Sequence, residues 1–472
     1  MSIQSPVERP SAPSAPSAES AADVVARLRA TFASGRTTSL AWRTTQLRGI
    51  VALLESCEDE LLAALAADLA KPAVEAYATD VGFARAEAKH ALAHLRRWVK
   101  PERVRTPLVA QPGRAWIRHE PLGVVLVIAP WNYPVQLTLG PLVGALAAGN
   151  CAVVKPSELA PATSAVLARR LPEFVDPEAV AVVEGGVPET TALLAERFDH
   201  VLYTGNGRVA RIVAAAAAAH LTPVTLELGG KSPVIVDRSA NLTVAATRVA
   251  WGRYLNAGQT CIAPDHALVH ESVIDEFTDA LGRAITTFYG ADPRVSPDYA
   301  RIVNDAHHHR LVGYLGDGTA VIGGEHDAAD RYLAPTVLRD VPDDAPSMTD
   351  EIFGPILPVR AVADVGEAVA FVNGRDKPLA LYVFGADAVA RHVVDATSSG
   401  SAAINATLLQ MSVPGLPFGG VGESGTGAYH GHHSFTTFSH AKAVLRRRAT
   451  PDPALAYPPY TASKERLLRR FL

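Results

Sequence analysis

Cysteine is scarce in this chain: Cys57, Cys151 and Cys261 are the three cysteines among 472 residues. An odd number without C-x-x-C spacing argues against a disulfide framework and a structural zinc site, and it indicates a reducing compartment such as the cytoplasm. Long apolar runs are also lacking, so no transmembrane segment is predicted. The net charge is only −4 and no long basic stripe occurs, which argues against a nucleic-acid partner.

The chain is too long for one ordinary core, and its patterns change along its length. The first 20 residues are rich in Ser, Ala and Pro and predict a disordered tail without a signal peptide. Residues 21–100 have helical spacing, and 115–120 resemble an exposed strand. From 121 to 228 strands and helices alternate, which predicts a parallel, doubly wound sheet. The expected strands are 124–129, 152–155, 180–184, 200–203 and 224–228, and the expected helices are 141–148, 163–171, 190–197 and 209–220.

A second α/β unit follows the Gly229-Gly230 pair, with a strand expected at 234–236 and a helix at 243–255. Glu227 precedes the break between the two units, and Cys261 follows the new helix. The two residues are therefore expected to face each other across an interdomain cleft, the usual place for a site.

Cys261 is the leading candidate for a nucleophile. It lies in the turn-prone run N-A-G-Q-T-C-I-A-P, and Glu227 lies 34 residues upstream in L-E-L-G-G-K-S-P. A thiol is the best neutral-pH nucleophile among side chains, and a nearby carboxylate can act as the base that activates water. A buried structural cysteine is the alternative interpretation.

Two segments favour a dinucleotide. Gly205, Asn206 and Gly207 begin a G-x-G-x-x-A turn between a strand and a helix, where backbone N–H groups can meet a pyrophosphate. Glu227 follows at about the distance of the usual ribose ligand, so that role is open to it as well. Lys155 and Glu158, in K-P-S-E at a strand end, are a better ribose-binding pair, although such a string is often only a solvated turn.

Other loops carry weaker patterns. Asn132, in P-W-N-Y-P after a buried strand, suits an oxyanion hole, or else it caps a rigid turn. The runs E-I-F-G-P, with Glu351 and Phe353, and P-F-G-G-V-G mean little alone. The histidines at 307–309 and 430–433 lack acidic or cysteine partners at metal spacing, so no metal site is predicted.

In their order along the chain these motifs resemble the aldehyde dehydrogenase superfamily, from about residue 25 to 445. The runs G-G-V-P-E-T-T and Y-H-G are similar to the class 3 and fatty aldehyde dehydrogenase branch. The resemblance implies an α/β fold with a Rossmann-like dinucleotide-binding domain (21–100 and 121–228) and an α/β catalytic domain (229–430). It also implies a small β oligomerisation arm from the bridging segments 101–120 and 431–472.

The resemblance also implies residue roles. Cys261 would attack the aldehyde to give a thiohemiacetal and then a thioester, with the oxyanion held by Asn132 and the Cys261 backbone N–H. Glu227 would activate the water that releases a carboxylic acid. Lys155 and Glu158 would hold the adenosine ribose of NAD or NADP, Glu351 the nicotinamide ribose, and Phe353 would pack nearby. The glycine turn, with Gly205, Asn206 and Gly207, would lie under the cofactor. The Glu158 carboxylate would repel a 2′-phosphate and favour NAD, although Lys155 could offset this.

The sequence also departs from the family. Ala210 stands where a glycine usually closes the turn, Asn405-Ala406 where this branch has Asn-Asp, and no hydrophobic membrane tail follows Leu472. We expect a soluble cytoplasmic homodimer with Val444–Arg448 as an intersubunit strand, acting on medium-chain aliphatic or aromatic aldehydes. The alternatives are a CoA-acylating dehydrogenase, which Glu227 disfavours, a non-catalytic protein on the same fold, and a thiol esterase as a side activity.

Overall fold

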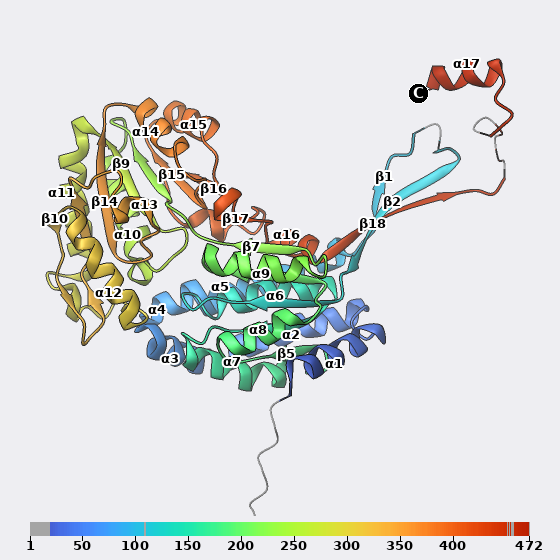
Figure 1. Cartoon of the computed structure of the whole chain (residues 1–472), viewed down its shortest axis with the longest axis horizontal. Coiled ribbons are helices and arrows are strands. Elements are labelled where there is room, and N and C mark those ends of the chain that lie inside the picture. The colour runs from blue at the N-terminus through green and yellow to red at the C-terminus, as the bar shows by residue number, and fades with distance from the viewer. Residues whose placement is uncertain (1–18, 108–109, 451, 453, 455–456, 472) are drawn as a thin grey trace, which may run out of the picture.

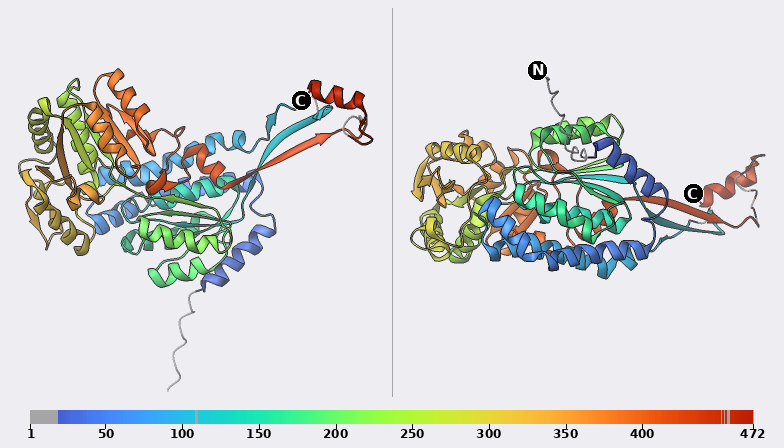
Figure 2. Two further views of the ribbon diagram at one scale, coloured as in Figure 1. Left: turned by 45° about the horizontal axis from the view of Figure 1, so that its top comes forward. Right: turned by 90° about the horizontal axis from the view of Figure 1, so that it is seen from below.

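The protein is described by a computed structural model for residues 19–107, 110–450, 452, 454 and 457–471. The predicted tail therefore lies, apart from Glu19 and Ser20, outside the described residues. Figures 1 and 2 show two lobes that lie side by side and an arm that projects from one of them.

The first lobe begins with helices, as the spacing of leucines in 21–100 predicts. Ser20 and Ser39 cap two of them, because each side chain accepts the N–H of the residue three positions later. The elements are α1 (Ala21–Ala33), α2 (Leu40–Ser56), α3 (Glu58–Leu69), α4 (Ala73–Ala76), the π-helical turn η1 (Tyr77–Val81) and α5 (Gly82–Trp98).

The sheet of this lobe has the order β17-β7-β6-β3-β4-β5, and all pairs are parallel except β17 with β7. The strand order reverses beside β3, which confirms the doubly wound arrangement. The strands are β3 (Val124–Ile128), β4 (Cys151–Lys155), β5 (Val180–Val182), β6 (His200–Thr204), β7 (Val224–Glu227) and β17 (Gly425–Thr426). The helices between them are α6 (Gln136–Ala148), α7 (Pro161–Phe174), α8 (Val187–Ala195) and α9 (Gly207–Ala218).

Helix α6 differs from the sequence prediction. It begins at Gln136 rather than at residue 141, and it contains Pro141. The reason is a remote cap: Asp80 Oδ1 accepts the N–H groups of Val135 and Gln136, so no local capping residue is needed. The helix is buried along its whole length between the sheet and helices α2 and α5.

The second lobe holds a sheet of order β10-β13-β14-β9-β8-β15-β16, parallel except for β10. Its strands are β8 (Pro233–Val236), β9 (His266–His270), β10 (Thr319–Ile322), β13 (Thr336–Arg339), β14 (Ile356–Val362), β15 (Ala380–Phe384) and β16 (Ser401–Ile404), beside the pair β11 (His326–Asp327) and β12 (Tyr332–Leu333). The helical segments are α10 (Leu242–Tyr254), η3 (Leu255–Gly258), α11 (Ile274–Tyr289), α12 (Asp305–Tyr314), α13 (Pro346–Thr349), α14 (Val365–Asn373) and α15 (Asp387–Ala396). The chain then returns to the first lobe, where α16 (Gly431–Thr437) packs against α6.

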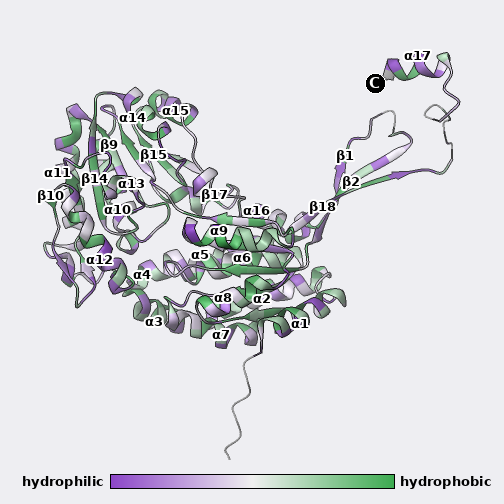
Figure 3. Cartoon of the chain, viewed as in Figure 1, coloured by the Kyte–Doolittle hydropathy of each residue, from purple (hydrophilic) through white to green (hydrophobic). Residues whose placement is uncertain are grey.

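The arm is an antiparallel sheet of β1 (Glu102–Val104), β2 (Gly113–Pro121) and β18 (Ser439–Arg447), in that order. Helix α17 (Ala462–Phe471) lies at its far end (Figure 1). In Figure 3 the strands of the two large sheets are mostly hydrophobic, whereas α17 mixes hydrophobic and hydrophilic residues. Among the described residues, no helix has both the length and the apolar character to traverse a bilayer.

Candidate active site

The loop that carries Cys261 follows a strained turn. Asn256, Ala257 and Gly258 have φ values of 54°, 50° and 74°, three successive left-handed conformations. Gly258 also needs to be a glycine for reasons of space, because a Cβ there would lie 2.3 Å from the Gly354 carbonyl oxygen. The turn ends α10 abruptly and directs Cys261 toward the first lobe.

Gln259 fixes this turn from within. Its Nε2 donates to the carbonyls of Asn256 and Arg301 at 3.0 Å each, and its Oε1 accepts the N–H of Val303 at 2.9 Å. The side chain is fully buried. The backbone just before Cys261 is thus held by three hydrogen bonds from one amide.

The Asn132 turn of the first lobe meets the Cys261 loop. Asn132 Nδ2 donates to the Gln259 carbonyl at 3.0 Å, and the hydroxyls of Tyr133 and Thr260 lie 2.6 Å apart. An amide NH₂ has two N–H donors, so the second remains for another acceptor. The Asn132 amide is therefore held against the loop that carries Cys261.

Glu227 ends β7 and is almost completely buried. Neither carboxylate oxygen has a hydrogen-bond partner within the described part of the chain. Burial raises the pKa of Glu227 well above its usual value, because a charged carboxylate without partners is costly in an apolar environment. Its backbone is held by the Gly205 N–H, which donates to the Glu227 carbonyl at 3.0 Å.

Cys261 is partly exposed and lies close to two acids. Burial raises the pKa of its thiol first, and the negative charges of Glu351 and Glu227 raise it further. The backbone N–H groups of Cys261 and Ile262 oppose this effect. The thiol thus holds its proton until a base or a positive charge favours the thiolate.

Glu351 lies against the Gly229-Gly230 turn: a Cβ on Gly229 would come within 2.1 Å of Glu351 Oε1. Burial raises the pKa of Glu351 to about 8, and the charge of Asp265 adds to the effect. Oε1 is buried without a hydrogen-bond partner among the described residues. Phe353 packs edge-on against Trp131, with ring centroids 5.3 Å apart, and so joins this loop to the Asn132 turn.

Lys155 and Glu158 lie at the carboxyl end of β4. Lys155 Nζ is 3.1 Å from Glu158 Oε2, and the lysine is buried whereas the Glu158 side chain is 48% exposed. The glycine turn follows the end of β6, in the same sheet. Asn206 Oδ1 accepts the Val209 N–H at 3.0 Å and caps α9, and a Cβ on Gly205 would collide with the Tyr203 hydroxyl.

Comparison with known proteins accounts for this arrangement. The profile of the aldehyde dehydrogenase family matches residues 9–444. The chain is 49% identical to aldehyde dehydrogenase family 3 member B1 of Rattus norvegicus over 94% of this chain and 96% of that protein. A relative from Canis lupus familiaris named "aldehyde dehydrogenase, dimeric NADP-preferring" is 45% identical over 94% of this chain and 99% of its own. The structure of Staphylococcus aureus AldH in a substrate-bound state superposes with a TM-score of 0.93, at 44% identity, over 95% of this chain and 99% of that one.

The chain belongs to the aldehyde dehydrogenase family. It is an enzyme that oxidises aldehydes with NAD(P), and its fold is that of the family. The predicted family and its class 3 branch are thereby confirmed.

The residues of this aldehyde dehydrogenase fit a nicotinamide dinucleotide. The partnerless Glu351 Oε1 beside Cys261 and the half-exposed Glu158 carboxylate can each accept a ribose hydroxyl, as oxygen acceptors at the ligand edge of such sheets do. Gly207 is the first residue of α9, where backbone N–H groups favour an anion, and a Cβ there would lie 3.1 Å from Arg211 Nη1.

Several supporting residues were not found from the sequence. Asp265 joins the buried Lys231 and Arg253 and accepts the Ile352 N–H at 3.2 Å, which holds the Glu351 loop. Tyr429, whose ring is buried near Glu227 and Cys261, was recognised only as part of a family motif. No sequence spacing marks these residues, because each acts across a long chain separation.

The histidines have other partners. His308 Nε2 lies 2.9 Å from the Tyr332 carbonyl, and His307 packs against Trp131. Within the described ranges no group of three or more possible ligands could hold a metal ion.

Proposed function

We propose that Cys261, Asn132 and Glu227 carry out the oxidation as nucleophile, oxyanion donor and base. The observation that supports this most is the partnerless, buried carboxyl of Glu227 near the partly exposed thiol of Cys261. Burying a carboxyl group without hydrogen-bond partners costs desolvation free energy, and such groups are typical of catalytic sites.

In the first half of the reaction the Cys261 thiol loses its proton to water, and the resulting thiolate sulfur attacks the carbonyl carbon. A C–S bond forms, and the π electrons move to oxygen, which accepts hydrogen bonds from Asn132 Nδ2 and the Cys261 N–H. When bound, the nicotinamide accepts the hydride that leaves this carbon. The C=O bond then re-forms, and the acyl group remains on Cys261 as a thioester.

In the second half Glu227 removes a proton from water. The hydroxide equivalent attacks the thioester, the C–S bond breaks, and a carboxylic acid and the Cys261 thiolate result. Because the pKa of Glu227 is raised, its carboxylate is a stronger base than an exposed glutamate once it has lost its proton.

When the cofactor is bound, Lys155 and Glu158 would hold the adenosine ribose and Glu351 the nicotinamide ribose, with Phe353 beside it. Gly205, Asn206 and Gly207 would line the dinucleotide site. The Glu158 carboxylate disfavours a 2′-phosphate and thus NADP, while Lys155, 3.1 Å away, weakens this effect. The name of the dog relative, NADP-preferring, supports use of both cofactors.

The first lobe (21–100 and 121–228) serves as the cofactor domain, and residues 229–430 serve as the catalytic domain, except that β17 pairs with β7 in the sheet of the first lobe. Residues 101–120 and 431–472 serve as the oligomerisation segments. The enzyme is a cytoplasmic homodimer that acts on medium-chain aliphatic or aromatic aldehydes. The dimeric name of the dog relative and the free edge of β18 in the arm support the dimer. The substrate class rests on the resemblance of the sequence motifs to the class 3 branch.

The test is an assay of the purified protein with aliphatic and aromatic aldehydes, with NAD or NADP and without CoA, following reduced nicotinamide by absorbance. We expect activity in the wild type and a loss of at least about 10⁴-fold in Cys261→Ala, because removal of a nucleophile abolishes the covalent route. Cys57→Ala is the matched control, since Cys57 is buried at the junction of α2 and α3.

Activity that survives in Cys261→Ala would refute the nucleophile assignment. Activity that appears only after CoA is added would refute the hydrolytic role of Glu227 and favour the acylating enzyme. Equal kcat/KM with NAD and NADP would refute the preference assigned to Glu158.

A further inference from the structure

A lysine and an aspartate are buried together behind the Asn132 turn. Lys71 Nζ lies 2.8 Å from Asp80 Oδ2, and neither side chain is exposed. Buried ion pairs add little stability on their own, because desolvation offsets their attraction. A role in fixing the geometry of a neighbouring group accounts better for this pair.

Both charges also hold the backbone of the Asn132 turn. Lys71 Nζ donates to the Asn132 carbonyl at 3.0 Å and lies 4.1 Å from the centre of the Tyr133 ring. Asp80 Oδ1 accepts the N–H groups of Val135 and Gln136 at 3.1 Å each. The turn is therefore held at both ends by one ion pair, which η1 and the end of α3 supply.

The same turn connects to the Cys261 loop through a second amide. Asn256 Nδ2 donates to the Asn132 carbonyl at 2.9 Å and to the Gln259 carbonyl at 3.2 Å. The Asn132 side chain donates to that same Gln259 carbonyl. Lys71 and Asn256 thus fix the Asn132 backbone, and this sets where its amide lies relative to Cys261.

We propose that Lys71 and Asp80 are positioning residues for aldehyde oxidation: they hold Asn132 so that its amide meets the oxygen of the aldehyde on Cys261. The inference rests on the proposed function, because Lys71 and Asp80 act through the oxyanion role of Asn132. Asp80 is presented by a π-helical turn, a distortion that recurs at functional sites.

The test is a double-mutant cycle of Lys71→Met and Asn132→Ala, with kcat and KM measured for one aldehyde that the wild type oxidises. We expect Lys71→Met to lower kcat roughly 10- to 100-fold with little change in KM, as a displacement of about 1 Å can do. Asn132→Ala should lower kcat about 10²- to 10³-fold. In the Asn132→Ala background Lys71→Met should cost almost nothing further, because no amide is left to position.

A lysine at the surface provides the control. Lys89 Nζ lies 2.7 Å from Glu55 Oε1 on exposed helix faces, and Lys89→Met should keep wild-type kcat. If Lys71→Met does not fold, Asp80→Asn takes its place. Its amide oxygen can still accept the N–H groups of Val135 and Gln136, but the charge that holds Lys71 is gone. We expect a loss of roughly 10-fold that also disappears in the Asn132→Ala background.

An equal fold-loss in both backgrounds would show that Lys71 only supports folding, and would overturn the inference. Wild-type kcat in Lys71→Met, with Asn132→Ala impaired, would overturn the inference alone and leave the proposed function intact. Wild-type kcat in Asn132→Ala would instead overturn the oxyanion assignment, and the inference with it.

Discussion

Burial, rather than ion pairing, determines the protonation of the central residues. Cys261, Glu227 and Glu351 each have a raised pKa, and desolvation is the largest cause for all three. The negative charges of the two glutamates raise the pKa of the thiol further. Raised pKa values make the two glutamates less readily ionised than exposed ones, so less negative charge surrounds the uncharged substrate, and Glu227 must lose its proton before it can act as the base of hydrolysis.

Glu227 can be tested through that step. Glu227→Gln removes the base and preserves the size of the side chain, so we expect the first turnover to form reduced nicotinamide normally and later turnovers to be slow. Stopped-flow absorbance should show a burst followed by a steady-state rate lower by about 10²-fold or more. Normal steady-state turnover would remove Glu227 from the base role.

The steady-state turnover of the wild type should also depend on pH, and the direction of the change can be predicted. Because the pKa of Glu227 is raised, its basic form becomes available only as the pH increases above the usual range of a carboxylate. Wild-type turnover, if limited by hydrolysis, should therefore rise as the pH increases above the range in which an exposed glutamate titrates, and the slow turnover of Glu227→Gln should lack this rise.

At the scale of the element, the turn η3 is the most strained segment beside the site. Its left-handed residues, together with the close approach of Gly258 to the Gly354 carbonyl, leave little freedom for the Cys261 loop. The Arg253 guanidinium donates to that same carbonyl, so the oxygen cannot easily move away. Position 258 requires glycine for two reasons: its φ is positive, and a Cβ there would collide with the Gly354 carbonyl. The loop therefore has little room to move.

We expect Gly258→Ala to affect stability and catalysis together. The clash should lower the free energy of unfolding by roughly 1–3 kcal/mol and kcat/KM by at least about 10-fold, since the loop must shift. Thermal unfolding and steady-state kinetics measure the two effects.

Gly290 supplies a matched control for that substitution. It also has a positive φ, of 80°, but no atom lies within 4 Å of a Cβ there, and it follows α11 away from Cys261. Gly290→Ala should cost about 1 kcal/mol of stability from the backbone alone and leave kcat/KM unchanged. Loss of activity in both variants would contradict a local role for Gly258.

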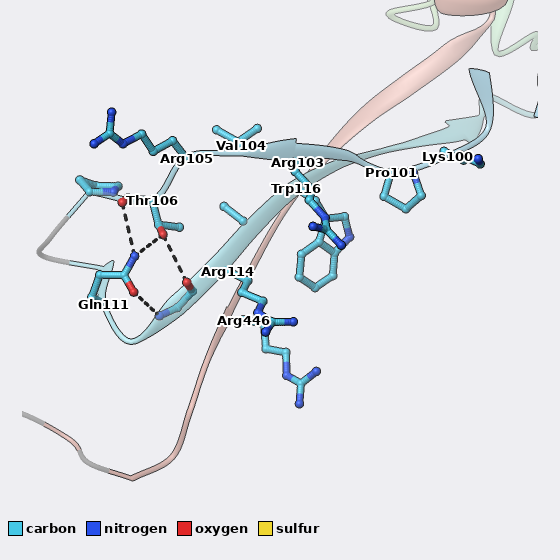
Figure 4. Close-up of a pocket in the computed structure, with 13 residues that line it drawn as sticks. Lys100, Pro101, Arg103, Val104, Arg105, Thr106, Gln111, Arg114, Trp116 and Arg446 are labelled. Atoms are coloured by element: carbon cyan, nitrogen blue, oxygen red, sulfur yellow. Dashed lines mark hydrogen bonds between the residues drawn. The ribbon is translucent and has the colours of Figure 1, made fainter. Parts of the chain in front are cut away.

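At the scale of the whole molecule, the arm is the part that bears on the proposed dimer. β18 is an edge strand whose outer backbone groups have no partner strand in the described chain, and Leu445 on it is 56% exposed. The arm also carries a concavity of about 1460 Å³. Its described lining, drawn in Figure 4, includes Lys100 and several arginines but no carboxylate.

The proposed dimer is tested by Leu445→Glu. A charge at the edge strand should weaken strand pairing between subunits, so we expect light scattering to show a shift from dimer toward monomer. Ile212→Glu is the control: Ile212 on α9 is also 56% exposed but lies outside the arm, and this variant should remain dimeric. A wild-type monomer, or an unchanged dimer in Leu445→Glu, would contradict the role of the arm.

Local sequence determined the elements and the chemistry of this protein. Buried runs such as Val124–Ile128 predict strands because β-branched residues favour them, and motif order identified the family, with Cys261, Glu227 and Asn132 as candidates. The predicted start of α6 was wrong, because the residue that caps the helix, Asp80, comes from another helical segment.

Only the tertiary structure decided how these residues behave. The raised pKa of Glu227 depends on what surrounds it after folding, and the contact of Lys71 with Asn132 joins segments 61 residues apart. Such properties arise from burial and long-range contacts, which no local pattern encodes. The sequence therefore determines which groups can react, and the packed structure determines their protonation and their positions.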